Sequence, residues 1–289
     1  MWQSYALMCS QPITMIQEEH GTKTVPCGKC ELCRARHVSG WTFRILEEMK
    51  DAESAHFVTM TYADHELPKI EYYFNDQDYW LLDNLDKSDV QKFFKRLRKY
   101  QEKTKLPKIR YYLTGEYGSE TERPHYHAII FNSSEELIIK AWSKFHLDTQ
   151  QREPIGHVHF GKVTEASVRY TLAYMNKPRI IPVDEYDTRQ PEFSLMSKGL
   201  GKRYLTDQMK NWHTSGKRKY VQLPGGQKAS MPRYYQEKIF SDQDKELMKL
   251  KSQITQASKS VEEVIDDGTI LYRKRDYREL RNSKRKQKL

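Results

Sequence analysis

Apolar residues recur along the chain with two different periods, and the changes between these periods predict the order of helices and strands. A helical period at Trp41, Ile45, Leu46 and Met49 predicts a helix over about residues 30–49. Stretches of β-branched and aromatic residues predict four strands, at 56–62 (HFVTMTY), 108–118 (KIRYYLTGEYG), 125–131 (HYHAIIF) and 156–163 (GHVHFGKV). Apolar stripes predict three further helices, one that Ser88 caps, one at 135–145 and one at 165–177.

This order of elements predicts an α+β domain, with an antiparallel sheet and helices on one face in a ferredoxin-like layer. The remaining segments carry weaker patterns. We expect irregular structure at 1–27, an inserted loop at 63–86, and a glycine-broken segment leading into a short helix at 192–205. From about Asp242 the high charge predicts a solvated helix or a partly disordered tail. We divide the chain into a Cys-rich segment, a central domain and a basic C-terminal extension, at 1–54, 55–205 and 206–289.

Composition adds a class of partner to this outline. The 289 residues include 37% hydrophobic residues and 19 tyrosines, which is compatible with a folded core, and the net charge is +10. Such a charge favours a polyanionic partner, because each Lys or Arg that neutralises a phosphate releases a counterion. Basic residues beside aromatic ones in KFFKRLRKY suggest a DNA-binding face, formed by Lys92, Lys95, Arg96, Arg98 and Lys99. The chain shows no leader and no apolar run that could span a bilayer, so we expect a soluble, intracellular protein without a membrane partner.

All four cysteines lie near the N-terminus, at Cys9, Cys27, Cys30 and Cys33. A secreted disulfide framework would spread its bridges more widely, whereas four thiolates are the number that a closed structural zinc site needs. Reduced cysteines without a ligand and an iron–sulfur cluster are the alternatives.

The segment RPHYHAIIF places two histidines two residues apart on a predicted strand. His125 and His127 would therefore point to the same face and could bind one cation, leaving positions open for a phosphate. Two ordinary strand histidines are the alternative. Glu116 lies near the end of the preceding predicted strand, and if the two strands are antiparallel neighbours it could supply an oxygen ligand. Such a mixed set of nitrogen and oxygen ligands suits Mg²⁺ or Mn²⁺. A second pair, His157 and His159, lacks such a carboxylate, and we expect it to have no role in metal binding.

Tyrosines recur at helical spacing in YTLAYMNK, where Tyr170, Tyr174 and Lys177 would share one helix face. A phenolate that attacks phosphorus needs a nearby cation to stabilise the charge that develops on the phosphate. The alternative is that both tyrosines pack on the sheet.

The motifs FVTMTY, GEYG, RPHYHAIIF and YTLAYMNK, in this order, resemble those of the HUH rolling-circle replication initiators, and most of all those of small single-stranded DNA bacteriophages of the Microviridae type. The cysteine-rich PCGKCELCR before them and FSLMSKGLG after them extend the resemblance over residues 9–205.

The resemblance implies an HUH endonuclease fold and a nickase that starts rolling-circle replication. His125 and His127 match the metal-binding pair of the family, and Glu116 matches a carboxylate that completes the site in many relatives. Tyr170 and Tyr174 match the paired tyrosines, one of which would form a 5′-phosphotyrosine bond and free a 3′-OH before the strand is rejoined. Lys177 matches a lysine that neutralises the phosphate. The implied partners are single-stranded DNA, origin DNA and the replication machinery of a bacterial host cell.

One position departs from the family pattern. Many two-tyrosine relatives carry a lysine between the tyrosines, where this chain has Ala173. If one tyrosine acts alone, we expect it to be Tyr174, which also fits a YxxK pattern. The chain has no GxxxxGK[ST] phosphate loop, so a helicase would come from the host. A relaxase or single-strand transposase is the alternative within the class, and a non-catalytic zinc-dependent nucleic-acid-binding protein the alternative outside it.

Overall fold

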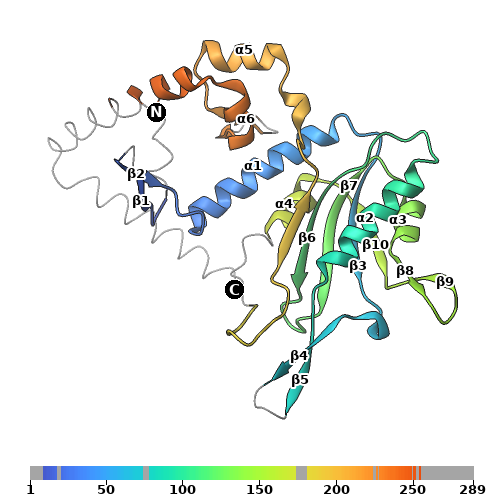
Figure 1. Ribbon diagram of the computed structural model, residues 1–289. Coiled ribbons are helices and arrows are strands. Elements are labelled where there is room, and N and C mark those ends of the chain that lie inside the picture. The colour runs from blue at the N-terminus through green and yellow to red at the C-terminus, as the bar shows by residue number, and fades with distance from the viewer. Residues whose placement is uncertain are drawn as a thin grey trace, which may run out of the picture.

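The computed structural model describes residues 9–17, 21–73, 78–173, 181–223, 226, 228–248, 250, 251 and 254. Its centre is an antiparallel sheet of five strands (Figure 1). In spatial order the strands are β10 (Val158–Lys162), β3 (Ala55–Thr61), β7 (Pro124–Phe131), β6 (Arg110–Tyr117) and β11 (Phe193–Met196). The predicted antiparallel α+β fold is confirmed, and β11 extends the sheet by one strand beyond the four predicted.

Helices cover both faces of this sheet (Figure 1). The four are α1 (Glu31–Met49), α2 (Lys87–Gln101), α3 (Glu135–Ala141) and α4 (Glu165–Ala173). Helices α2 and α3 pack on one face, as a ferredoxin-like layer requires, while α1 and α4 pack together on the other face. The expectation of helices on one face is therefore incomplete. The strands themselves explain why, because alternate residues such as Tyr112 and Ile129 are apolar on the second face and need cover.

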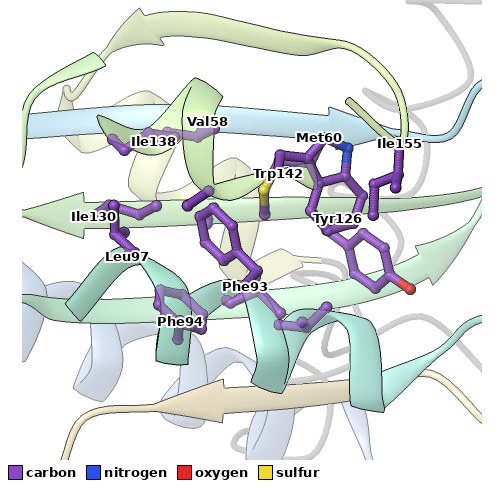
Figure 2. Close-up of a cluster of buried hydrophobic side chains, with 14 of the residues drawn as sticks. Val58, Met60, Phe93, Phe94, Leu97, Tyr126, Ile130, Ile138, Trp142 and Ile155 are labelled. Carbon is purple, nitrogen blue, oxygen red and sulfur yellow. The ribbon is translucent and has the colours of Figure 1, made fainter. Parts of the chain in front are cut away.

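The larger core lies between the sheet and α2 and α3 (Figure 2). Val58, Met60, Tyr126 and Ile130 point from β3 and β7 toward Phe93, Phe94 and Leu97 of α2, with Trp142 closing one end (Figure 2). Trp142 donates its indole N–H to the Thr61 carbonyl over 3.0 Å. This packing holds β3 and β7 in register, and β7 carries His125 and His127 of the candidate site.

Several sequence expectations need correction. The segment 1–27 contains a hairpin, and 63–86 contains a one-turn 3-10 helix and a second hairpin, in place of irregular loops. Helix α3 ends at Ala141, earlier than expected, because a third hairpin begins at Ser143. The additional elements are β1 (Ile13–Gln17), β2 (Gly21–Val25), η2 (Asp64–Glu66), β4 (Lys69–Tyr73), β5 (Tyr79–Asp83), β8 (Ser143–His146) and β9 (Gln151–Pro154).

The N-cap of α2 is Asp86, not Ser88. The Asp86 side chain accepts hydrogen bonds from the backbone N–H groups of Ser88 and Asp89, which places the capping oxygen two residues earlier than expected.

A smaller C-terminal lobe packs against the outer side of α1 (Figure 1). It consists of η4 (Lys202–Tyr204), α5 (Asp207–Ser215), β12 (Tyr220–Gln222), β13 (Lys228–Ser230) and α6 (Arg233–Ile239). Phe43 of α1 enters its core and meets Tyr204 and Tyr235 edge to face, with ring centroids 4.9 and 5.9 Å away. No helix in the described part of the chain is long and apolar enough to cross a membrane.

Candidate active site

The three predicted metal ligands meet on the face of the sheet that carries α1 and α4. Strands β6 and β7 pair so that Glu116 lies directly opposite His125, with His127 two residues further along. Side chains two residues apart share a face, and the same alternation puts Tyr112 and Ile129 under α1 and α4. The sequence pattern thus placed these ligands on one face, and the strand register brings them together.

Both histidine rings turn Nε2 toward Glu116. His125 Nε2 lies 2.7 Å and His127 Nε2 lies 3.2 Å from Glu116 Oε1. The opposite nitrogens are held from behind, since His125 Nδ1 donates to the Arg123 carbonyl at 3.0 Å and His127 Nδ1 lies 3.0 Å from Thr59 Oγ1. A histidine that keeps its proton on Nδ1 offers the Nε2 lone pair to a metal. The Arg123 carbonyl, which can only accept, selects this tautomer for His125, and the Thr59 hydroxyl is able to accept the same proton from His127.

The electrostatic setting suits a cation. Burial opposes ionisation of Glu116, but hydrogen bonds and charge from His125 and His127 outweigh it, so the pKa of Glu116 lies below its ordinary value. One ligand atom from each of the three residues falls within 4.8 Å of the others. Two imidazole nitrogens and one carboxylate oxygen form a donor set that could hold a divalent cation and that leaves room for further ligands.

Tyr170 lies beside this cluster. Its ring centroid is 5.5 Å from that of His127 and 6.3 Å from that of Phe57, and 49% of the residue is exposed. Phe57 in turn stacks on His127, with centroids 5.7 Å apart and ring planes 9° from parallel. The tyrosine is therefore next to the candidate metal ligands and open to a substrate. Tyr174 and Lys177 lie outside the described residues.

The other histidine pair lies on the same face but further out in the sheet. His159 pairs with Thr59, which pairs with His127, and the His157 carbonyl accepts from Thr61 N–H. Both His157 and His159 are exposed, and strands β3 and β7 lie between them and Glu116. Among the described residues they belong to neither group of side chains that could hold a metal.

The basic residues of α2 lie on the opposite side of the sheet from the cluster, because α2 packs on the other face. Lys92, Lys95, Arg98 and Lys99 are exposed there, whereas Arg96 is half-buried and donates to the Ala141 carbonyl over 2.9 Å. Arg96 therefore helps to join α2 to α3.

The four cysteines also come together, at the start of α1. Their sulfur atoms all lie within 4.8 Å of one another, and the Cys27 sulfur accepts backbone N–H bonds from Lys29 and Cys30. Gly28 allows this tight loop because it adopts a φ of +74°. Hydrogen bonds to its sulfur, the strongest from Ser10, lower the pKa of Cys30, which favours the thiolate.

Two supporting residues have no signal in the sequence. Thr59 and Phe57 belong to an ordinary β-branched and aromatic strand, and only the pairing of β3 with β7 places them against His127. The alternation of β3 indicates which residues share its inner face, but it does not identify the neighbouring strand.

Comparison with known proteins gives matches along most of the chain. Residues 55–179 match the family model of the replication-associated protein ORF2. The replication-associated protein VP4 of Bdellovibrio phage phiMH2K is 27% identical over 267 residues, covering 86% of this chain and 78% of that protein. The replication-associated protein ORF2 of Spiroplasma virus 4 is 33% identical over 196 residues, covering 64% and 58%. The replication-associated protein ORF4 of Chlamydia phage 1 is 25% identical over 228 residues, covering 74% and 53%. No solved structure matches the chain significantly.

Proposed function

We propose that the chain nicks origin DNA to initiate rolling-circle replication, on the premise that residues 55–179 match the family model of the replication-associated protein ORF2 and that the chain resembles small-phage replication-associated proteins, as its motifs predicted. The observation that carries the proposal is the contact of Tyr170 with the cluster. The ring centroid of Tyr170 lies 5.5 Å from that of His127, and His127 with Glu116 and His125 could hold a divalent cation.

A Mg²⁺ or Mn²⁺ ion at Glu116, His125 and His127 would polarise the scissile phosphate. The tyrosine oxygen, from Tyr170 or Tyr174, attacks phosphorus as its proton leaves. A phosphorus–oxygen bond to the tyrosine forms, the bond to the 3′ oxygen breaks, and the 3′ oxygen takes up a proton. The products are a 5′-phosphotyrosine and a free 3′-OH. Lys177 is proposed to neutralise the phosphate during this step.

The same exchange in reverse rejoins the strand. A 3′-OH attacks the phosphotyrosine and restores a phosphodiester without an external energy source, because one phosphoester bond replaces another. The second tyrosine would cut the regenerated origin, and strand separation would be left to a helicase of the bacterial host, in whose cytoplasm the protein would act.

The test is a covalent protein–DNA band on a denaturing gel after incubation with single-stranded origin DNA and Mn²⁺ or Mg²⁺. We expect the band with wild-type protein and none when Tyr170→Phe and Tyr174→Phe are combined. The single variants show which tyrosine attacks. His157→Ala/His159→Ala is the matched control for His125→Ala/His127→Ala and should retain the band. A band that survives loss of both tyrosines would show that another nucleophile attacks and would overturn the assignment of the tyrosines. Absence of the band with wild-type protein would overturn the nickase proposal and favour a non-catalytic DNA-binding role.

We also propose that Cys9, Cys27, Cys30 and Cys33 hold a structural Zn²⁺. Four thiols close to one another and the N–H bonds to sulfur support this assignment, because a closed tetrahedral thiolate site is typical of structural zinc. Elemental analysis should find one zinc per chain, and Cys27→Ser should lose it. Iron with visible absorbance would instead indicate a cluster.

A further inference from the structure

The net positive charge of the chain lies entirely in its C-terminal part. Residues 1–201 contain 27 basic and 28 acidic residues, whereas residues 202–289 contain 22 basic and 11 acidic residues. The family match at 55–179 holds 19 basic and 17 acidic residues, so it is nearly neutral. The candidate nickase domain therefore offers little electrostatic attraction of its own for a polyanion.

Part of this positive region is the C-terminal lobe, residues 202–248, which lies outside the family match and has its own core. It holds ten basic and five acidic residues, which leaves a net charge of +5. Five of its cations pair with carboxylates, namely Arg203 with Asp51, Lys210 with Asp207, Lys217 with Asp244, Arg233 with Glu237 and Lys245 with Asp242.

Cations and aromatic rings alternate on this lobe. The Arg218 guanidinium lies 4.6 Å over the Trp212 ring, which meets Tyr220 edge to face at 5.6 Å, and Lys228 Nζ lies 4.6 Å over Tyr220. Lys238 Nζ lies 5.6 Å over Tyr234 on α6. These aromatic residues are half-buried, so each ring is partly open to solvent. Surfaces that interleave cations with aromatic rings bind nucleic acids through phosphates and stacked bases.

The lobe lies on the side of the sheet that carries the candidate active site. It packs on α1, and α1 with α4 covers one face of the sheet (Figure 1). His127 and Glu116 share this face with Ile129 and Tyr112, because side chains alternate along a strand. The basic face of α2 lies on the other side. DNA bound at the cluster would therefore lie on the same side of the sheet as the lobe, and on the opposite side from the basic face of α2.

We propose that residues 202–248 form a sequence-independent clamp for the phosphodiester backbone of DNA beside the nicking site. The inference rests on the proposed function for its choice of DNA as the polyanion. The clamp supplies affinity, while the nearly neutral domain at 55–179 supplies the chemistry.

The experiment measures binding of labelled single-stranded and duplex DNA by fluorescence anisotropy across a salt series, without added Mg²⁺ or Mn²⁺. Binding is then independent of nicking, so failure of the nickase proposal does not affect the result. The variant is Lys228→Gln/Lys238→Gln, in which both side chains are exposed, and the matched control is Lys95→Gln/Lys99→Gln on α2. Each pair removes two positive charges, and circular dichroism with thermal melting verifies folding.

Removing one cation that neutralises a phosphate lowers the slope of log affinity against log salt by about 0.9 on duplex DNA and about 0.7 on a single strand. The lobe variant should therefore lose about 1.8 of the duplex slope, which is roughly 60-fold in affinity at 0.1 M salt, or about 1.4 of the single-strand slope. A loss of slope on one DNA alone identifies the form that the lobe holds, and the full expected loss on each shows that it holds both. An unchanged slope on both DNAs, or an equal loss in the α2 control, would overturn the proposal.

Discussion

Thr59→Val removes one hydroxyl from behind the candidate metal site and leaves the three ligands in place. Thr59 Oγ1 lies 3.0 Å from His127 Nδ1, and His127 is only 5% exposed, so water cannot easily replace the lost partner. Valine has nearly the same shape as threonine and suits a strand, so the change adds neither a cavity nor a backbone strain.

The expected loss follows from these two facts. A buried polar group without its partner costs about 1–3 kcal/mol. Loss of a group that orients a metal ligand lowers metal affinity by about 10–100-fold, equivalent to about 1.4–2.8 kcal/mol. The two ranges overlap, and we expect Thr59→Val to weaken Mn²⁺ binding by about 10–100-fold, because the His127 ring loses the partner that orients it.

The assay is titration of Mn²⁺ into the protein, followed by calorimetry or electron paramagnetic resonance, and it requires no DNA. Thr61→Val is the matched control. Thr61 lies on the same strand and face, is half-buried like Thr59, and sits opposite His125, whose Nδ1 is held by the Arg123 backbone carbonyl. Equal Mn²⁺ affinities of Thr59→Val and wild type, or an equal loss in Thr61→Val, would refute the reasoning.

Three further predictions concern the scaffold. Gly161→Ala would place a Cβ 2.9 Å from Phe57 Cδ1, so the Phe57 ring, which stacks on His127, must shift. We expect a loss of about 1–3 kcal/mol in unfolding free energy together with weaker Mn²⁺ binding. Normal Mn²⁺ affinity would show that the Phe57 ring does not support the metal site. Arg189→Met leaves the buried Asp187 carboxylate without its bidentate partner and should cost about 3–5 kcal/mol in urea unfolding at pH 7. Burial opposes ionisation of Asp187, but its bonds to Arg189 and to backbone N–H groups outweigh burial and hold its pKa below the ordinary value. The difference in unfolding free energy between wild type and Arg189→Met should therefore be full above about pH 4 and fade as the pH falls further. A difference that stays constant with pH would contradict the ion pair as its cause. Phe93→Ala empties a fully buried position under the sheet and should cost about 3–5 kcal/mol, while a value under about 1 kcal/mol would show that the core collapses to fill it.

Sequence patterns predicted most elements of the central domain because strong local periods survive folding. The alternation in HYHAIIF and the apolar stripe of α2 both reappear in the structure. Strand β11 escaped prediction because four residues, FSLM, are too few to reveal a period beside glycines. The sequence pattern predicts loops where the structure has the β4–β5 and β1–β2 hairpins, because polar and acidic residues interrupt the short apolar runs of these strands.

By itself the sequence determined which residues could carry chemistry. Spacing of two on a strand commits His125 and His127 to one face, and a cysteine-rich start commits four thiols to one neighbourhood. Only the tertiary structure decided which groups surround them. Pairing of β3 with β7 brings Thr59 and Phe57 to His127, and packing of α4 brings Tyr170 to the same ring. Packing also put the basic face of α2 behind the sheet and the C-terminal lobe on the side of the site. The physical reason is that backbone periodicity fixes the face on which a side chain lies, whereas strand register and helix packing, which depend on contacts between distant segments, fix its neighbours.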